Sequence, residues 1–226
     1  MSCFVNLSEK RARTGRYQGG IKLIGEAQGA VAGCCGGVTR NEKKTFGNGS
    51  AHDDQEGFLV IRGHGEALIG DEKIRLEPGV ALIVPAGVSH DMRCDEDCDC
   101  LETFWFHSAV KAGSVPQIKT RCYTSIQEKT GRPMASCQLL TAENGCVDGC
   151  VAGVTVYEDT EYQESDCHED QEGFFVLEGT GYAKVDDEEF PISPGTAFMA
   201  PAGALHWLRR DENCPYVAAL WFHSAL

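Results

Sequence analysis

Two stretches of the chain decide its fold: HDDQEGF at residues 52–58 and HEDQEGF at residues 168–174. They lie 116 residues apart, and the same register continues without a gap to the run WFHSA at residues 105–109 and 221–225. A repeat of this length indicates two whole domains rather than a short solenoid unit. The shared residues are mostly His, Glu, Gly and Pro, the types used for metal ligation and for tight turns.

The duplication divides the 226 residues into two units, each of a common domain size. We predict an N-terminal domain over residues 1–116 and a C-terminal domain over residues 117–226, with a linker around residues 111–116. Within each unit, β-prone runs such as residues 57–62 alternate with turns such as residues 85–87. Short strands at this spacing predict an all-β sandwich or barrel.

The composition limits the classes of partner. A hydrophobic share of 42% and a charged share of 24% are typical of a globular protein. The formal net charge of −14 disfavours nucleic acid and anionic membranes, because phosphate binding needs a basic surface. The N-terminal residues do not have the pattern of a signal peptide, and no long apolar run predicts a membrane helix. We therefore expect a cytoplasmic protein.

Twelve cysteines leave three alternatives open: a disulfide scaffold, a metal cluster, or buried thiols. Disulfide scaffolds are usually much shorter chains. The clusters Cys94-x3-Cys98-x-Cys100 and Cys146-x3-Cys150 lack the paired CxxC spacing of zinc knuckles. We expect mostly buried, reduced thiols, and a structural zinc or iron–sulfur site is the less favoured alternative.

Side chains able to bind a metal gather around each repeat. Because side chains alternate along a strand, we expect His52, Asp54 and Glu56 on one face. His90, which follows the turn at residues 85–87, can supply a further imidazole from a neighbouring strand. Such a set suits a divalent metal with open coordination positions. The equivalent residues of the second repeat are His168, Asp170, Glu172 and His206.

These residues resemble the cupin superfamily, whose two motifs are G-x5-H-x-H-x3,4-E-x6-G and G-x5-P-x-G-x2-H. The first repeat contains His52-x3-Glu56-x6-Gly63 and then Gly79-x5-Pro85-x-Gly87-x2-His90. The second repeat contains both patterns again, between His168 and His206. The resemblance implies a two-domain cupin, or bicupin, made of tandem jelly-roll barrels. It also implies a divalent transition metal as cofactor: Fe, Mn, Ni or Zn.

Both repeats depart from the family pattern at one position. The family's first histidine is replaced by Ser50 in the first repeat and by Asp166 in the second. Ser50 is a poor ligand, whereas Asp166 offers a carboxylate. The resemblance therefore implies two ligand sets, which are His52, Glu56 and His90 in the first repeat and Asp166, His168, Glu172 and His206 in the second.

The alternative is that one or both repeats kept the fold and lost the metal. We favour a metal because a buried Glu without a cation is costly. If only one repeat holds a metal, we expect it in the second, where Asp166 adds ligand charge.

Three further pairs of residues have expected roles. His107 and His223 are weak catalytic candidates, either as acid/base groups or as supports for a ligand, and the alternative is a histidine that only bonds to backbone. Gln55 and Gln171 should point away from the ligands and serve packing or hydrogen bonding. Phe58 and Phe174 should form an apolar wall of each pocket.

The function expected from the resemblance is an enzyme that acts on a small oxygenated organic substrate, of the dioxygenase or of the isomerase/lyase type. A non-catalytic module that binds a small molecule or a sugar is the alternative, and a storage role is a less favoured third. We expect a monomer or a homodimer, because a bicupin already contains the pair that single-domain cupins form by dimerising.

Overall fold

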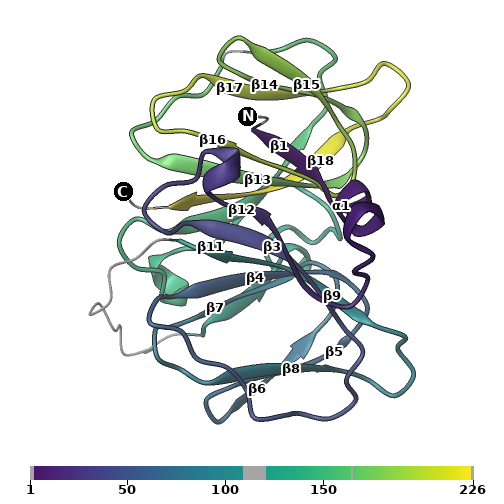
Figure 1. The fold of residues 1–226 in the computed structure, drawn as a ribbon, viewed down its shortest axis with the longest axis vertical. Coiled ribbons are helices and arrows are strands. Elements are labelled where there is room, and N and C mark those ends of the chain that lie inside the picture. The colour runs from purple at the N-terminus through teal and green to yellow at the C-terminus, as the bar shows by residue number, and fades with distance from the viewer. Residues whose placement is uncertain (1–2, 109–120, 164, 225–226) are drawn as a thin grey trace.

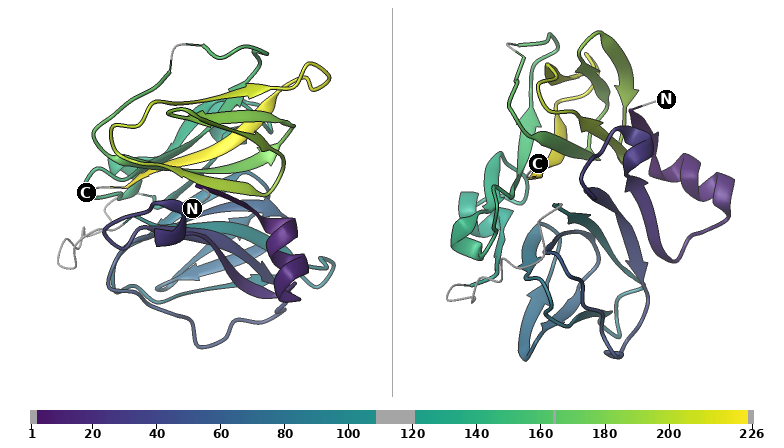
Figure 2. Two further views of the ribbon diagram at one scale, coloured as in Figure 1. Left: turned by 45° about the horizontal axis from the view of Figure 1, so that its top comes forward. Right: turned by 60° about the vertical axis from the view of Figure 1, so that its left-hand side comes forward.

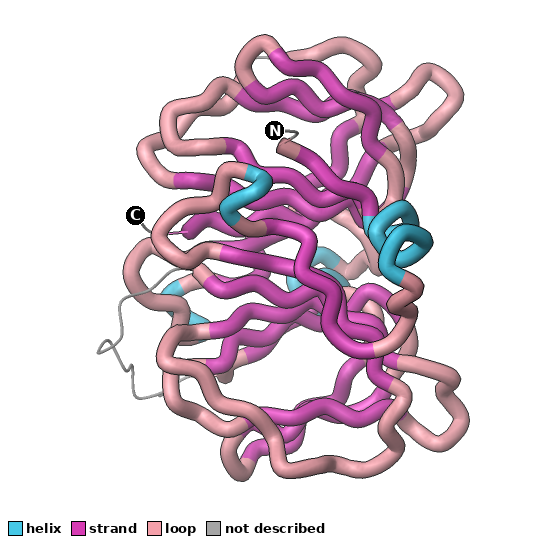
Figure 3. The backbone as a smooth tube through the Cα atoms, viewed as in Figure 1, coloured by secondary structure: helices cyan, strands magenta, loops and turns pink. Residues whose placement is uncertain are grey.

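A computed structural model describes residues 3–108, 121–163 and 165–224. The predicted linker at residues 111–116 and the predicted boundary between residues 116 and 117 lie outside the described residues. So do Ala109 and Ala225, the last residues of the repeated WFHSA runs. Figure 3 shows strands in every layer of the molecule and only short helices, so the all-β prediction is confirmed.

The N-terminal half contains a six-stranded and a three-stranded antiparallel sheet (Figure 1). In sheet order, the larger sheet consists of β10 (Tyr123–Ser125), β7 (Val80–Val84), β4 (Glu56–Arg62), β9 (Leu101–His107), β3 (Cys35–Asn41) and β2 (Gly19–Ile24). The smaller sheet consists of β6 (Glu72–Leu76), β5 (Gly65–Ile69) and β8 (His90–Cys94).

The C-terminal half repeats this pair of sheets. Its larger sheet consists of β1 (Phe4–Asn6), β16 (Thr196–Ala200), β13 (Gln171–Glu178), β18 (Val217–Ser224), β12 (Val151–Tyr157) and β11 (Cys137–Leu140). Its smaller sheet consists of β15 (Glu188–Ile192), β14 (Gly181–Val185) and β17 (His206–Arg210). Among the described residues, strand pairing keeps two separate sheets in each half, so the expected barrels are jelly rolls of two sheets.

The short strands that precede each half are exchanged between the halves. Strand β1 pairs with β16 of the C-terminal half, and β10 pairs with β7 of the N-terminal half. Each of these strands leads into a short helix, α1 (Leu7–Thr14) or α2 (Ile126–Thr130). Figure 2 shows the N-terminal strand lying against the other half of the molecule. The first strand of the chain is therefore not part of the sheet that follows it in sequence.

The two larger sheets lie against each other in the middle of the molecule, and the smaller sheets lie at its two ends (Figure 1). Aromatic rings fill the space between the halves: Phe106 stacks on Phe222 at 4.4 Å, and Phe104 contacts Phe175 at 4.7 Å between ring centroids. In β4 and β13, consecutive residues are buried, so both faces of these strands are covered. This explains why they carry long apolar runs instead of a simple alternation.

Gly57 makes this aromatic contact possible. A Cβ atom at position 57 would lie 2.2 Å from Cζ of Phe106, so only glycine lets the ring lie flat across β4. Gly173 holds the same place under Phe222, with a distance of 2.3 Å. The Gly of the repeated HxDQEGF stretch is therefore explained by the contact between the halves.

Gln55 and Gln171 also join the halves. Oε1 of Gln171 accepts a hydrogen bond from the N–H of Val31 at 2.9 Å, and its Nε2 donates to the carbonyl of Val31 at 3.1 Å. Gln55 makes the same pair of bonds with Val147, at 3.2 Å and 3.1 Å. Both glutamines point away from the pockets and are hydrogen-bonded, as expected, and their partners lie in the opposite half.

All twelve cysteines are free thiols, and seven of them are buried. In the part of the chain that the structure describes, no helix has the length and apolar character needed to cross a bilayer.

Candidate metal centres

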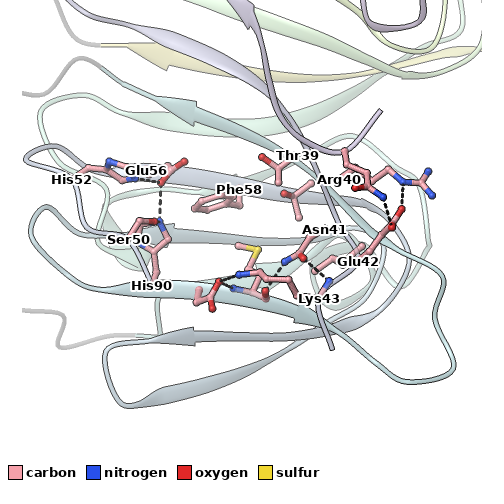
Figure 4. Close-up of a pocket in the computed structure, with 16 residues that line it drawn as sticks. Thr39, Arg40, Asn41, Glu42, Lys43, Ser50, His52, Glu56, Phe58 and His90 are labelled. Carbon is pink, nitrogen blue, oxygen red and sulfur yellow. Dashed lines mark hydrogen bonds and ion pairs between the residues drawn. The ribbon is translucent and has the colours of Figure 1, made fainter. Parts of the chain in front are cut away.

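In the N-terminal half, two imidazoles meet one carboxylate oxygen. Glu56 is the first residue of β4, His90 is the first residue of β8, and His52 lies in the loop before β4. Nε2 of His52 lies 3.2 Å from Oε2 of Glu56, and Nε2 of His90 lies 3.0 Å from the same oxygen. Figure 4 shows the three side chains converging at one end of the pocket. The three ligand atoms lie within 4.8 Å of one another, as a metal site requires.

The C-terminal half has the same arrangement. Nε2 of His168 lies 3.1 Å from Oε2 of Glu172, and Nε2 of His206 lies 2.8 Å from it. The two glutamates are almost fully buried, with 7% of Glu56 and 6% of Glu172 exposed. Such burial makes an unneutralised carboxylate costly in both halves.

The expectation that alternation along a strand places His52 beside Glu56 is wrong. Strand β4 begins at Glu56, and residues 52–55 form a loop, so alternation along a strand does not place His52. The chain turns instead, which brings His52 to Glu56 and sends the side chain of Asp54 toward His107. The same holds in the second repeat, where β13 begins at Gln171.

Neither residue at the missing histidine position joins these groups. Ser50 bridges to His90 through backbone hydrogen bonds, and its Oγ lies 3.4 Å from Nε2 of His90. Asp166 bridges to His206 in the same way, and one of its carboxylate oxygens accepts a hydrogen bond from the N–H of Cys167 at 2.8 Å. Asp166 lines the pocket but is not in the cluster of His168, Glu172 and His206.

His107 and His223 do lie at these centres. Glu56 is directly opposite His107 in the antiparallel pair of β4 and β9, and residues opposite each other share a face of the sheet. Nε2 of His107 lies 3.5 Å from Oε1 of Glu56, the oxygen that His52 and His90 do not contact. The distance between Nε2 of His223 and Oε1 of Glu172 is also 3.5 Å. Their contacts are with carboxylates, and not with backbone only.

Sequence reasoning missed the role of two aspartates. Nδ1 of His107 lies 3.0 Å from both carboxylate oxygens of Asp54. Nδ1 of His223 lies 3.1 Å and 3.0 Å from those of Asp170. A signal was present, because Asp is retained at the third position of both HxDQEGF stretches.

Without a cation, the electrostatics favour a charged glutamate and raise the pKa of His90 and His107, two of the imidazoles that face it. Burial alone would raise the pKa of Glu56, but its contacts with His107 and His90 outweigh burial and lower the pKa to about 2. Burial acts to lower the pKa of His90, and its contact with Glu56 outweighs this and raises it. Oε2 of Glu56 is buried and has no hydrogen bond of good geometry, which leaves a buried anionic oxygen facing two imidazoles.

The two pockets differ although their centres match. The N-terminal pocket has a volume of about 450 Å³ and the C-terminal pocket about 230 Å³. Asn41 and Asp91 line the larger pocket, and the equivalent positions in the smaller one are Tyr157 and Trp207, whose rings meet edge to face at 5.7 Å. As expected, Phe58 and Phe174 line the two pockets.

Charged residues line the N-terminal pocket at the end away from His52 and Glu56. Figure 4 shows Arg40 and Lys43 there, with Phe58 between them and the glutamate. Both cations are already paired: Nε of Arg40 lies 3.0 Å from Glu42, and Nζ of Lys43 lies 2.7 Å from Asp91. Among the described residues that line this pocket, Glu56 at the histidine end has a buried oxygen, Oε2, without a hydrogen bond.

Comparison with known proteins gives a family and a fold. A sequence model of the family described as "Cupin domain" matches residues 42–105 and 153–223. No curated protein matches the chain in sequence. The structure is similar to an oxalate decarboxylase with a TM-score of 0.74 and 11% identity, over 100% of this chain and 78% of that one. It is also similar to salicylate 1,2-dioxygenase from Pseudaminobacter salicylatoxidans, with a TM-score of 0.70 and 12% identity, over 96% and 80% of the two chains. A third similar structure is the protein Ylba from E. coli, with a TM-score of 0.68 and 15% identity, over 90% and 81%.

Proposed function

The chain belongs to the cupin domain family, and from this premise we propose that it is a metal-binding bicupin whose domains span residues 1–116 and 117–226. Each half holds one divalent transition metal: Fe, Mn, Ni or Zn. The ligands proposed from the clusters above are His52, Glu56 and His90 in the N-terminal half, and His168, Glu172 and His206 in the C-terminal half.

One observation carries this proposal: in each half, two Nε2 atoms lie 2.8–3.2 Å from one oxygen of a buried glutamate. Two ligands that are each about 2.1 Å from one ion, at right angles to each other, are about 3.0 Å apart. The observed separations therefore suit neighbouring ligands of a single ion. The buried and unsatisfied Oε2 of Glu56 supports the same conclusion, because a cation would neutralise it.

We propose that the N-terminal half carries the chemistry, as an enzyme of the dioxygenase or of the isomerase/lyase type. Its pocket of about 450 Å³ can take a small organic molecule, and Phe58 gives it an apolar wall. A bound divalent metal would supply a Lewis acid to polarise an oxygen of the substrate. Since Arg40 and Lys43 are already paired, the substrate is anchored by its own oxygens at the histidine end.

For the C-terminal half we propose a non-catalytic role. Tyr157 and Trp207 narrow its pocket to about 230 Å³, too small for most organic substrates beside a metal. The alternative for the whole chain, a module that binds a small molecule or sugar without turnover, would extend this role to both halves.

Metal content measured on protein purified without chelator tests the proposal. Two further groups could hold a metal: the surface trio His64, Asp95 and Asp97, and the trio His168, Asp170 and His223, which shares His168 with the proposed C-terminal ligands. The parent carries H64A to remove the first, and H168A removes a member of both C-terminal groups. We expect two metals per chain in this parent, one in E56Q, one in H168A and none in the variant with both changes. A parent that stays free of metal after supplementation with Fe, Mn, Ni and Zn in turn would refute the metal-binding function. Oxygen uptake and product analysis with a panel of small hydroxy acids and phenols then separate an enzyme from a binding module.

A further inference from the structure

His107 and His223 lie beside the glutamate of each proposed centre. Three imidazoles surround each glutamate: Oε2 of Glu56 faces Nε2 of His52 and His90, and Oε1 faces Nε2 of His107 at 3.5 Å. The ring centroids of His52 and His107 are 5.0 Å apart, no farther than the 5.3 Å between His52 and His90. His107 therefore belongs to the same cluster of rings.

The other nitrogen of His107 is held in the way a ligand requires. Its Nδ1 lies 3.0 Å from both oxygens of Asp54, so the Nδ1–H donates to this carboxylate. A histidine whose Nδ1–H is used in this way presents the lone pair of Nε2, and a carboxylate behind a ligating imidazole fixes its orientation and raises its basicity. His90 is held in the same tautomer by the carbonyl of Val88, at 3.2 Å.

The C-terminal half repeats each contact. Nε2 of His223 lies 3.5 Å from Oε1 of Glu172, and Nδ1 of His223 lies 3.0 Å from the nearer oxygen of Asp170. The ring centroids of His168 and His223 are 4.4 Å apart. The contacts of His223 with Asp170 and Glu172 thus match those of His107 with Asp54 and Glu56, in a pocket with about half the volume and other wall residues. The Asp–His–Glu contacts therefore accompany the glutamate in both halves and do not depend on the shape of the pocket. Asp170 differs from Asp54 in also lying 2.7 Å from Nδ1 of His168.

We infer that His107 and His223 are the third imidazole ligands of the two metal centres, each held in its ligating tautomer by Asp54 or Asp170. They supply the imidazole that is missing at positions 50 and 166, where the chain has Ser50 and Asp166. This inference rests on the proposed function. The competing reading is that His107 is an imidazolium that bridges two carboxylates and never touches a metal.

Cobalt(II) binding to a single centre separates the two readings. In a background of H168A and H64A, both C-terminal groups that share His168 and the surface trio at His64 are removed, so the N-terminal centre is isolated. Co²⁺ is titrated against a chromophoric chelator while its d–d absorption is recorded. We expect H107A to weaken Co²⁺ binding by about 100-fold or more and to change the d–d spectrum, and 10 mM imidazole to restore part of both. We expect D54N to weaken binding by about 10- to 100-fold, the usual cost of losing a group that supports a ligand. The neighbouring D53N is the matched control, since Asp53 is exposed and should leave binding unchanged.

The outcomes keep the two proposals apart. If H107A and D54N bind Co²⁺ like the background while adding E56Q abolishes binding, His107 is not a ligand and the proposed metal function stands. If the background itself binds no Co²⁺, or binds it equally well with E56Q, the proposed metal function fails and this inference fails with it. Should H107A not fold, as judged by circular dichroism, D54N and H107Q decide the question through the spectrum and the affinity.

Discussion

Replacing Gln171 with alanine removes a paired contact between the two halves of the molecule. Its side chain is 1% exposed, accepts the N–H of Val31 at 2.9 Å, and donates to the carbonyl of Val31 at 3.1 Å. Each lost hydrogen bond costs about 1 kcal/mol, and each buried group left without a partner adds about 1–3 kcal/mol. Val31 is 50% exposed, so water can replace part of the contact. We therefore expect Q171A to lower the free energy of unfolding by about 3 kcal/mol.

Thermal unfolding of the metal-free protein measures this effect without any contribution from a metal. For a chain of this size, about 3 kcal/mol corresponds to a fall in Tm of about 6–12 °C. Q171E should cost at least as much, because a carboxylate cannot donate to the carbonyl of Val31. The control is Q138A, at an exposed position of β11, which should stay within about 0.5 kcal/mol of the parent. A Tm of Q171A equal to that of Q138A would refute the claim that this glutamine holds the halves together.

Three further predictions concern the N-terminal half. G57A places a Cβ atom 2.2 Å from Cζ of Phe106 and should cost about 1–3 kcal/mol in urea unfolding. N41Y combined with D91W should narrow the larger pocket toward the volume of the smaller one without changing the metal content. Catechol, used as a bidentate oxygen probe, should then no longer raise the Tm of the metal-loaded protein. The pKa of Glu56 is lowered from 4.5 to about 2, so the charged carboxylate stabilises the metal-free protein above pH 4.5, and this stabilisation is lost as the pH falls toward 2. Denaturant titrations should show the free energy of unfolding falling over this range, and E56Q should make the fall smaller.

G57A has a matched control, and each of the three predictions can be contradicted by a stated result. G20A is the match for G57A, because its Cβ would meet only Oγ1 of Thr39 at an ordinary 3.5 Å; equal stability of the two variants would show that Phe106 does not need the glycine. A narrowed pocket that still responds to catechol would place the probe elsewhere. An E56Q protein with the same pH slope as the parent between pH 4.5 and 2 would assign that slope to other carboxylates.

The sequence was sufficient to predict the fold because the repeat keeps one register from residue 52 to residue 108 and again from residue 168 to residue 224. Turn residues at equal positions in both copies mark the same strand ends, so one pattern supports the other. The exchange of β1 and β10 could not be predicted. Each strand has only three residues, and their partners in β16 and β7 are set by the packing of the two halves.

The candidate centres were predictable only in part. His52, Glu56 and His90 are the residues the motif implies, and they do come together, although His52 arrives through a loop. The contact of Asp54 with His107 depends on the pairing of β4 with β9, and such pairing joins residues 53 positions apart. The difference between Asn41 and Tyr157 has meaning only once both are known to line a pocket.

An anomalous-scattering map at the absorption edge of the co-purified metal is the most direct test of the two proposed centres. We predict one peak in each half, next to the glutamate carboxylate and within about 2.0–2.2 Å of Nε2 of three histidines. These are His52, His90 and His107 in the N-terminal half, and His168, His206 and His223 in the C-terminal half. A map without a peak at either glutamate, from crystals of protein supplied with Fe, Mn, Ni or Zn, would contradict this prediction.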